Sequence, residues 1–177
     1  ADPELIEVCA AHGAGMVLMH TEVRPKSQLW DEGLYPDGIA AHQRRFFEGR
    51  LESLAAAGVA PEQVVLDPGP DFAKTPRQTV DALRGLDGLA ALGRPIMLAV
   101  SRKDFIGAIT HRRPSERGAG TLAALAWGLD HGARILRVHD VAGTVDFLRV
   151  RAALTGEREV DPGLRIADET GGAARRP

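Results

Sequence analysis

Several classes of protein require residues that this sequence has little of. A single cysteine in 177 residues excludes a disulfide framework within the chain. No apolar run approaches the roughly 20 residues that span a bilayer, and no signal-peptide pattern is present, so we expect a cytoplasmic protein with no membrane partner. The formal net charge of -2 gives no reason to expect nucleic acid as a partner.

Motifs that mark common cofactor and catalytic sites are also missing. No group of His and Cys has the spacing of a structural zinc site, no Gly-rich loop matches a nucleotide-binding fingerprint, and no Gly-x-Ser-x-Gly segment marks a hydrolase nucleophile. The composition, 44% apolar and 26% charged, is that of an ordinary globular protein with enough length for a core. The chain begins Ala-Asp-Pro, without Met, and enters a helix at once, so we expect a fragment or a trimmed product.

The most informative feature that is present is a set of three short apolar runs that end in polar residues. The runs are 64–66, 96–100 and 135–136, and they lead into Asp67, Lys103 and His139. These three polar residues are separated by 36 and again by 36 residues, the length of one strand, one helix and two loops. Because the carboxyl ends of parallel strands converge, the spacing predicts one active site at these ends.

Strands and helices alternate along the chain. The expected strands are 16–19, 64–66, 96–100 and 134–138, and the expected helices are 3–12, 39–58, 76–92, 118–131 and 142–154. We expect a loop over 101–117 and a mostly disordered tail over 157–177. Short strands that are apolar throughout favour a parallel α/β sheet covered by helices. Four such units make half of an eight-stranded barrel or, alternatively, an open four-stranded sheet, with the domain over 1–156.

The side chains at the strand ends suit an anionic ligand and a planar heterocycle. Arg137 and His139 stand at i and i+2 of a strand, so they point to one face, where a guanidinium and an imidazole can hold phosphate oxygens. The Asp67 carboxylate can accept two parallel N–H bonds from an aminopyrimidine-like edge. The alternatives are that Arg137 pairs with a surface carboxylate, that His139 caps the strand, and that Asp67 only forms the turn Asp-Pro-Gly.

Other strand-end residues are open to more than one interpretation. Lys103 can reach over the strand end as a mobile cation, whereas Arg102 is expected on the opposite face in a structural role. Met19 can form an apolar floor for a flat ring. His20 is either a ligand or a histidine whose polar atoms are satisfied at the strand end. Arg117 belongs to a basic loop that we interpret as a solvated surface.

Together these segments resemble dihydropteroate synthase, an enzyme family of folate biosynthesis. The segments that carry the resemblance are 17–20, 65–75, 101–107 and 137–141, and the similarity extends over about 3–154 in one register. The resemblance implies a TIM barrel of which this chain contains strands five to eight. It implies condensation of 6-hydroxymethyl-7,8-dihydropterin diphosphate with p-aminobenzoate, which gives 7,8-dihydropteroate and diphosphate.

The resemblance also implies roles for individual residues. Asp67, Lys103 and Met19 would bind the pterin, Arg137 and His139 would hold the diphosphate, and Phe72 and Asp104 would flank p-aminobenzoate. Lys103, Arg137 and His139 would be the catalytic residues. Mg²⁺ would act on the diphosphate as a Lewis acid, with its protein ligand outside this chain. The family's usual homodimer is a further expectation.

Two departures from the family pattern support other functions. The family commonly has Gly where Asp71 stands and Ser where Asp104 stands. Asp104 places a negative charge near the expected p-aminobenzoate carboxylate, and this favours a protein that binds pterin or phosphate without turnover. A pterin-dependent methyltransferase is another alternative, although Arg137 and His139 favour diphosphate chemistry.

Overall fold

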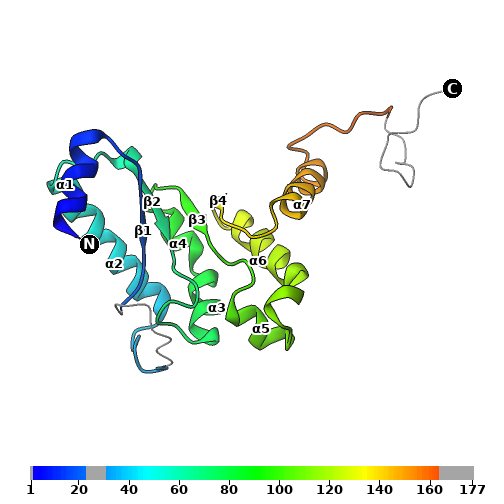
Figure 1. Cartoon of the computed structure of the whole chain (residues 1–177), viewed down its shortest axis with the longest axis horizontal. Helices are drawn as coiled ribbons and strands as arrows, with labels where there is room; N and C mark the ends of the chain where they lie inside the picture. Colours follow the sequence, from blue (N-terminus) through cyan, green and yellow to red (C-terminus); the bar gives the residue numbers. More distant parts are fainter. Residues whose placement is uncertain (1, 23–30, 164–177) are drawn as a thin grey trace. The chain divides into compact units, whose positions relative to one another are not determined.

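The computed structural model describes residues 2–22 and 31–163 (Figure 1). The chain divides into two compact units, Ala1–His139 and Asp140–Pro177. The elements are, in chain order, α1 (Pro3–His12), β1 (Met16–Met19), α2 (Ile39–Ala56), β2 (Val64–Asp67), α3 (Pro76–Arg84), α4 (Leu86–Ala90), β3 (Ile96–Leu98), α5 (Asp104–Thr110), α6 (Gly118–Asp130), β4 (Ala133–Leu136) and α7 (Val141–Leu154). Short 3₁₀ turns cover Pro61–Gln63 and Pro114–Glu116.

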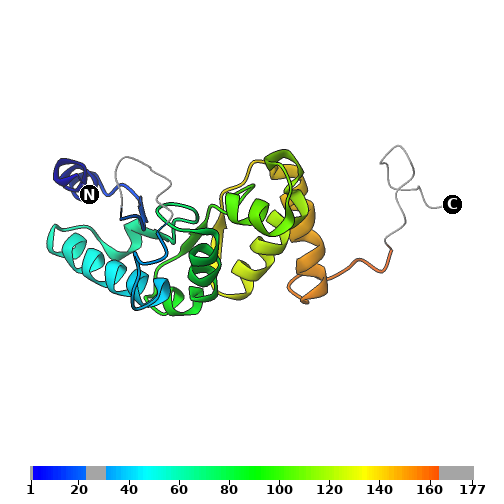
Figure 2. The ribbon, with the colours of Figure 1, turned by 90° about the horizontal axis from the view of Figure 1, so that it is seen from below.

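The first unit is built on a parallel sheet with the strand order β1-β2-β3-β4 (Figure 1). Because the order follows the sequence and parallel crossovers are right-handed, every crossover returns over the same face of the sheet. Figure 2 shows α2 in cyan and α6 in yellow-green on the same side of the strands. This arrangement confirms the predicted parallel α/β class, with helices wound over one face.

The two faces of the sheet differ in burial. On what we call the covered face, the side chains are 0–2% exposed; they are Val64, Leu66, Ile96 and Leu98. Gly128 of α6 lies so close to Leu98 that a β-carbon there would clash. On what we call the pocket face, the side chains are partly or well exposed; they are Val17, Val65, Met97 and Ile135. The helix-packed core therefore lies against the covered face.

Local sequence signals explain most of the helix ends. Thr75 Oγ1 accepts the Gln78 backbone N–H at 3.1 Å, and Gln78 Oε1 accepts the Thr75 N–H at 2.9 Å, so a capping box opens α3 at the predicted residue 76. The predicted helix 76–92 is instead two helices, α3 and α4, joined at Gly85. A β-carbon at Gly85 would lie 2.7 Å from Ala40 Cβ of α2, so this glycine permits a close helix contact.

The predicted loop 101–117 is also wrong, because it contains α5. Phe105 and Ile106 of α5 are buried and anchor the helix to the unit. A helix of seven residues is too short to show a clear 3.6-residue period in the sequence.

The second unit contains α7, whose first turn is capped by Asp140, since Asp140 Oδ1 accepts the Gly143 N–H at 3.0 Å. The predicted domain end at 156 stays a prediction. Residues 164–177, which make up most of the predicted tail, lie outside the described residues. Among the described residues, no helix is both long and apolar enough to cross a membrane.

Candidate active site

A pocket of about 620 Å³ lies at the carboxyl ends of the strands of the first unit. All seven residues to which the family resemblance gave a role line it; they are Met19, Asp67, Phe72, Lys103, Asp104, Arg137 and His139. Asp71, Ala99, Ser101, Arg102, Pro114 and Val138 complete the lining. The fold therefore brings the predicted residues together, while their individual roles stay predictions.

Asp67 is the last residue of β2 and lies opposite Met19 of β1 in the strand register. Its side chain is 4% exposed, and Oδ1 accepts the Gly69 backbone N–H at 2.8 Å. Burial raises the pKa of the Asp67 carboxyl, while the Gly69 N–H and three nearby cations act in the opposite direction. A buried, oriented carboxylate in a pocket can accept N–H groups from a flat polar ligand.

Lys103 follows β3 and supplies a cation to the pocket, near Asp67. Its Nζ lies 4.5 Å from the centroid of the Phe72 ring, within the range of a cation–π contact. Burial raises the pKa values of Asp67 and Asp71, and Coulomb attraction to this ammonium partly offsets the rise. Lys103 and Phe72 thus form one side of the pocket, with a charge over an aromatic face.

Arg137 and His139 extend from the end of β4. The Arg137 N–H donates to the Leu98 carbonyl at 2.9 Å, which fixes the backbone beside β3. Ser101 Oγ lies 3.0 Å from His139 Nδ1 and accepts the His139 backbone N–H at 3.3 Å. The Ser101 contact uses Nδ1 and so leaves Nε2 as the ring nitrogen for a ligand. Through these two contacts Ser101 positions the His139 ring.

Arg102 was expected on the opposite face, and this expectation is wrong, because Arg102 lines the pocket. Strict alternation stops after β3, and Arg102 adopts a left-handed backbone with φ 59°. Its N–H donates to Thr121 Oγ1 at 3.0 Å, which holds the turn in place.

The two departures from the family pattern form a connected network. Asp71 has φ 62°, a region that Gly adopts freely and that Asp tolerates better than most residues. Asp71 Oδ2 accepts the Asp104 backbone N–H at 2.6 Å, and burial raises the pKa of the Asp71 carboxyl. Asp104 Oδ1 pairs with Arg117 Nη1 at 3.0 Å. The negative charge of Asp104 is therefore balanced by Arg117.

The sequence suggested that Arg117 belongs to a solvated basic loop, whereas in the structure its side chain makes several contacts with neighbouring backbone. Its side chain is 11% exposed, and Nη1 also donates to the carbonyls of Arg102 and Lys103 at 2.8 and 3.1 Å. These bonds hold the turn that carries Lys103 into the pocket. Nothing in the local sequence signals this role, because Arg117 lies 14 residues from Lys103.

A buried lysine that the sequence analysis missed supports the loop after β2. Lys74 is 2% exposed, and its Nζ donates to the carbonyls of His20, Gly69 and Phe72 at 3.2, 3.0 and 2.9 Å. Burial lowers the pKa of Lys74 to about 7. Its three carbonyl contacts show that Lys74 holds the loop together rather than facing a ligand.

The pocket residues do not provide a ligand set for Mg²⁺. Asp67 Oδ1 accepts the Gly69 backbone N–H. Asp71 Oδ1 accepts the Thr79 hydroxyl, and Asp71 Oδ2 accepts the Asp104 backbone N–H. Lys103 and Arg137 add positive charge near Asp67. Mg²⁺ prefers several oxygen ligands in near-octahedral geometry, so the described part of the pocket does not fit it.

Comparison with known proteins places this geometry in a family. The family model described as "Pterin binding enzyme" matches residues 1–139, which is the whole of the first unit. The chain belongs to the pterin binding enzyme family. Its strand-end pocket lies within the matched segment.

The relatives of this pterin binding enzyme family member carry the name dihydropteroate synthase. The chain is 39% identical over 156 residues to dihydropteroate synthase of Synechocystis, covering 86% of this chain and 53% of the relative. It is 35% identical over 161 residues to "Inactive dihydropteroate synthase 2" of Mycobacterium leprae, covering 89% and 55%. The structure of the Xanthomonas albilineans synthase in complex with 7,8-dihydropteroate superposes with a TM-score of 0.77 at 34% identity, covering 90% and 56%. The chain thus spans about half the length of the curated relatives it matches.

Proposed function

We propose that this chain forms strands five to eight of a dihydropteroate synthase TIM barrel. The observation that carries the proposal is the single pocket that joins Asp67, Lys103, Arg137 and His139 at the carboxyl ends of three neighbouring strands. Sequential parallel strands with helices over one face are the arrangement of a barrel segment, in which the other face points inward. The exposed apolar side chains of the pocket face are consistent with this orientation.

The proposed reaction is the condensation of 6-hydroxymethyl-7,8-dihydropterin diphosphate with p-aminobenzoate. Asp67 accepts N–H bonds from the aminopyrimidine edge of the pterin, and Met19 and Lys103 contact its ring. Arg137 and His139 hold the diphosphate and stabilise the negative charge that develops as the C–O bond to it breaks. The amine nitrogen of p-aminobenzoate then forms the new C–N bond to that carbon and loses one proton to solvent, while diphosphate leaves. Mg²⁺ stays a proposal from the family resemblance, and none of these steps depends on it.

The second substrate would bind at the side of the pocket formed by Phe72 and Asp104. The Phe72 ring can flank the aromatic ring of p-aminobenzoate. The Arg117 guanidinium neutralises Asp104, so the carboxylate of the substrate does not meet an unbalanced negative charge. We also expect a cytoplasmic location, from the sequence, and a homodimer, from the family resemblance; both stay predictions.

A second candidate function is pterin or phosphate binding without turnover. Asp71, which stands where the family commonly has Gly, favours it, and so does the similarity to a mycobacterial relative whose name describes it as inactive. The methyltransferase alternative is less favoured, since Arg137 and His139 supply a site for an anion that methyl transfer does not need.

Titration with the pterin diphosphate, followed by an assay of diphosphate release with and without p-aminobenzoate, tests the proposal. Because the proposed barrel also needs strands one to four, the assay uses a protein that supplies them together with this chain. Release that depends on p-aminobenzoate supports the synthase. Binding without release in that complete protein supports the non-catalytic alternative, and absence of pterin binding overturns both. In the complete protein Lys103→Ala and Arg137→Ala should each abolish turnover, whereas Arg44→Ala, an exposed arginine of α2, serves as the control.

A further inference from the structure

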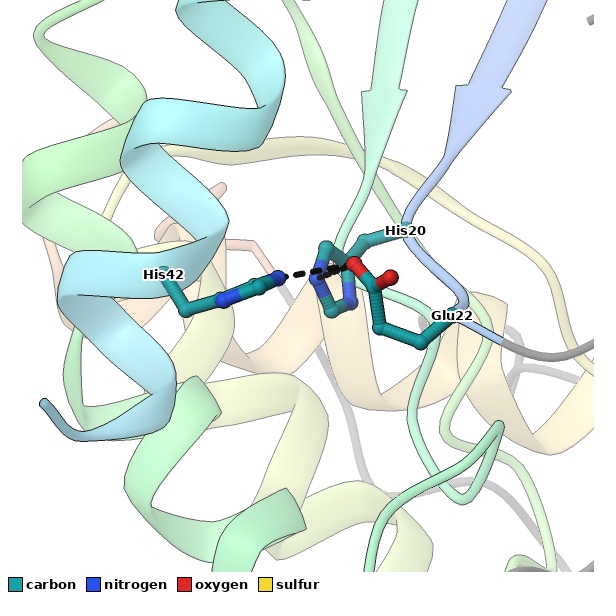
Figure 3. A group of neighbouring side chains, drawn as sticks. All are labelled: His20, Glu22 and His42. Carbon is teal, nitrogen blue, oxygen red and sulfur yellow. Dashed lines mark hydrogen bonds and ion pairs between the residues drawn. The ribbon is translucent and has the colours of Figure 1, made fainter. Parts of the chain in front are cut away.

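A second group of titratable side chains lies outside the pocket, between the end of β1 and helix α2. Among the described residues, His20, Glu22 and His42 are the one group of three or more His, Cys, Asp or Glu side chains whose ligand atoms all lie within 4.8 Å of one another. Glu22 Oε1 is 2.7 Å from His42 Nε2 and 3.9 Å from His20 Nε2. Figure 3 shows the Glu22 carboxylate close to both imidazole rings.

His20 is the unusual member of this cluster. Its side chain is fully buried, and neither ring nitrogen has a hydrogen-bond partner among the described residues. A buried polar group without a partner is costly, so natural proteins rarely keep one without a reason. The sequence left open whether His20 is a ligand or a strand-end histidine whose polar atoms are hydrogen-bonded. In the structure, neither of its ring nitrogens has such a bond among the described residues.

The surroundings hold the His20 ring in a fixed position. The Phe46 ring meets it edge-on at a centroid distance of 4.8 Å, and Tyr35 and His42 lie at 5.9 and 5.3 Å. An imidazole that is held in place and whose ring nitrogens have no hydrogen-bond partner among the described residues can offer one of them to a metal ion.

We propose that His20, Glu22 and His42 bind a divalent transition-metal ion, Zn²⁺ in the first instance. Two imidazoles and one carboxylate are a donor set that zinc accepts, with a fourth position left for water. Tetrahedral zinc with bonds of about 2.0–2.1 Å places its ligand atoms roughly 3.3 Å apart. The two Glu22 distances fall on either side of that value, and the ligand atoms of the two histidines lie within 4.8 Å of each other. Shifts of up to roughly 1.5 Å would therefore complete the site.

The location gives the metal a structural role. His20 and Glu22 follow β1, whereas His42 lies in the first turns of α2, so the ion would join two segments that are 20 residues apart. Glu22 and His42 side chains are 35% and 30% exposed, which leaves a route for the ion from solvent. Met19 lines the pocket, and His20 beside it packs against the rings of α2. The ion would therefore stabilise the segment that carries Met19, without contacting a ligand in the pocket.

Zinc titration of the untagged 177-residue chain by calorimetry tests the proposal, after a chelator has removed bound metal. We expect one Zn²⁺ per chain, and a rise in Tm when it is added. His42→Ala and Glu22→Gln should each weaken zinc binding at least tenfold and remove the rise in Tm. Both side chains are partly exposed, so these variants should fold, which circular dichroism without zinc will verify.

Matched controls separate this site from other histidines and from the pocket. His12→Ala and Glu52→Gln replace exposed residues of α1 and α2, and His139→Ala replaces the pocket histidine. Zinc binding should be unchanged in all three variants. Co²⁺ should give the visible spectrum of a tetrahedral site in the unmodified chain and lose it in His42→Ala. Absence of zinc binding, or equal binding by His42→Ala and the unmodified chain, would overturn the proposal and leave the pterin proposal intact.

Discussion

On the covered face of the sheet Ile96 of β3 is fully buried, whereas on the pocket face Ile135 of the neighbouring β4 keeps 39% of its surface exposed. The covered face consists of apolar side chains packed against helices. The pocket face has exposed apolar side chains along the strands and charged side chains at their carboxyl ends. Burial of apolar surface stabilises the fold, whereas charges held partly out of water in a pocket cost stability and supply chemistry. The covered face thus contributes most to the stability of the fold, and the pocket face provides the binding site.

The largest effect should come from shortening one isoleucine on each face. Ile96→Ala removes fully buried methyl groups and should lower the free energy of unfolding by about 2–5 kcal/mol. Ile135→Ala removes groups that are already partly in water and should cost less than about 1 kcal/mol. Denaturant unfolding of both variants measures the difference. Equal losses would show that the pocket face of the isolated chain is as well covered as the other.

Much of this division could be predicted from the sequence. The strands could be predicted because buried parallel strands are short, apolar throughout and bounded by turns. The pocket residues could be predicted because polar residues that follow such runs meet at one edge of the sheet. Thr75 and Pro76 indicated the start of α3, because Thr is a favoured N-cap residue and Pro is favoured at the first helical position.

The pterin clamp gives the next largest effect, and Asp67→Asn should change binding and stability in opposite directions. Asn cannot accept two N–H bonds from the pterin, so pterin affinity should fall at least tenfold, which is about 1.4 kcal/mol. Calorimetric titration with the pterin diphosphate measures this loss. Asp87→Asn on α4, an exposed position, is the matched control.

The stability of Asp67→Asn should rise at neutral pH. Burial raises the pKa of Asp67 in the folded chain above its unfolded value. The contribution of this carboxyl to stability is therefore present below the unfolded pKa and lost as pH rises through the folded pKa. The gain from Asn should vanish in acid, below about pH 4, where the unfolded Asp is also protonated. A loss of stability at pH 7 would contradict the view that the pocket carboxylate costs stability.

A smaller effect is expected from Ser101, which acts on the pocket through His139. Ser101→Ala removes the 3.0 Å contact with His139 Nδ1 and the acceptor for the His139 N–H. Affinity for inorganic diphosphate should fall about fivefold, equivalent to roughly 1 kcal/mol for one hydrogen bond. Ser53→Ala on the exposed side of α2 should change nothing. Unchanged diphosphate affinity in Ser101→Ala would remove Ser101 from the positioning of His139.

The parts of the site that the sequence could not predict depend on contacts between distant segments. Arg117 reaches the turn at Lys103 from 14 residues away, and no local pattern distinguishes it from the other arginines of its loop. Arg102 enters the pocket because one backbone torsion becomes positive after β3. His20 and His42 meet only because α2 packs against the end of β1. Local propensity does not encode these tertiary contacts, so only the fold reveals them.

The smallest effect should come from a nearly isosteric change on the pocket face. Val17 of β1 is 51% exposed, and threonine has the same branched shape and suits a strand. Val17→Thr should therefore change the free energy of unfolding by no more than about 0.5 kcal/mol. Val64→Thr on β2, where the side chain is 2% exposed, should cost about 1–3 kcal/mol because its hydroxyl leaves water. Denaturant unfolding at two protein concentrations compares the pair. A cost for Val17→Thr that matches Val64→Thr and grows with concentration would mean that a second copy covers the pocket face, because only association makes stability depend on concentration.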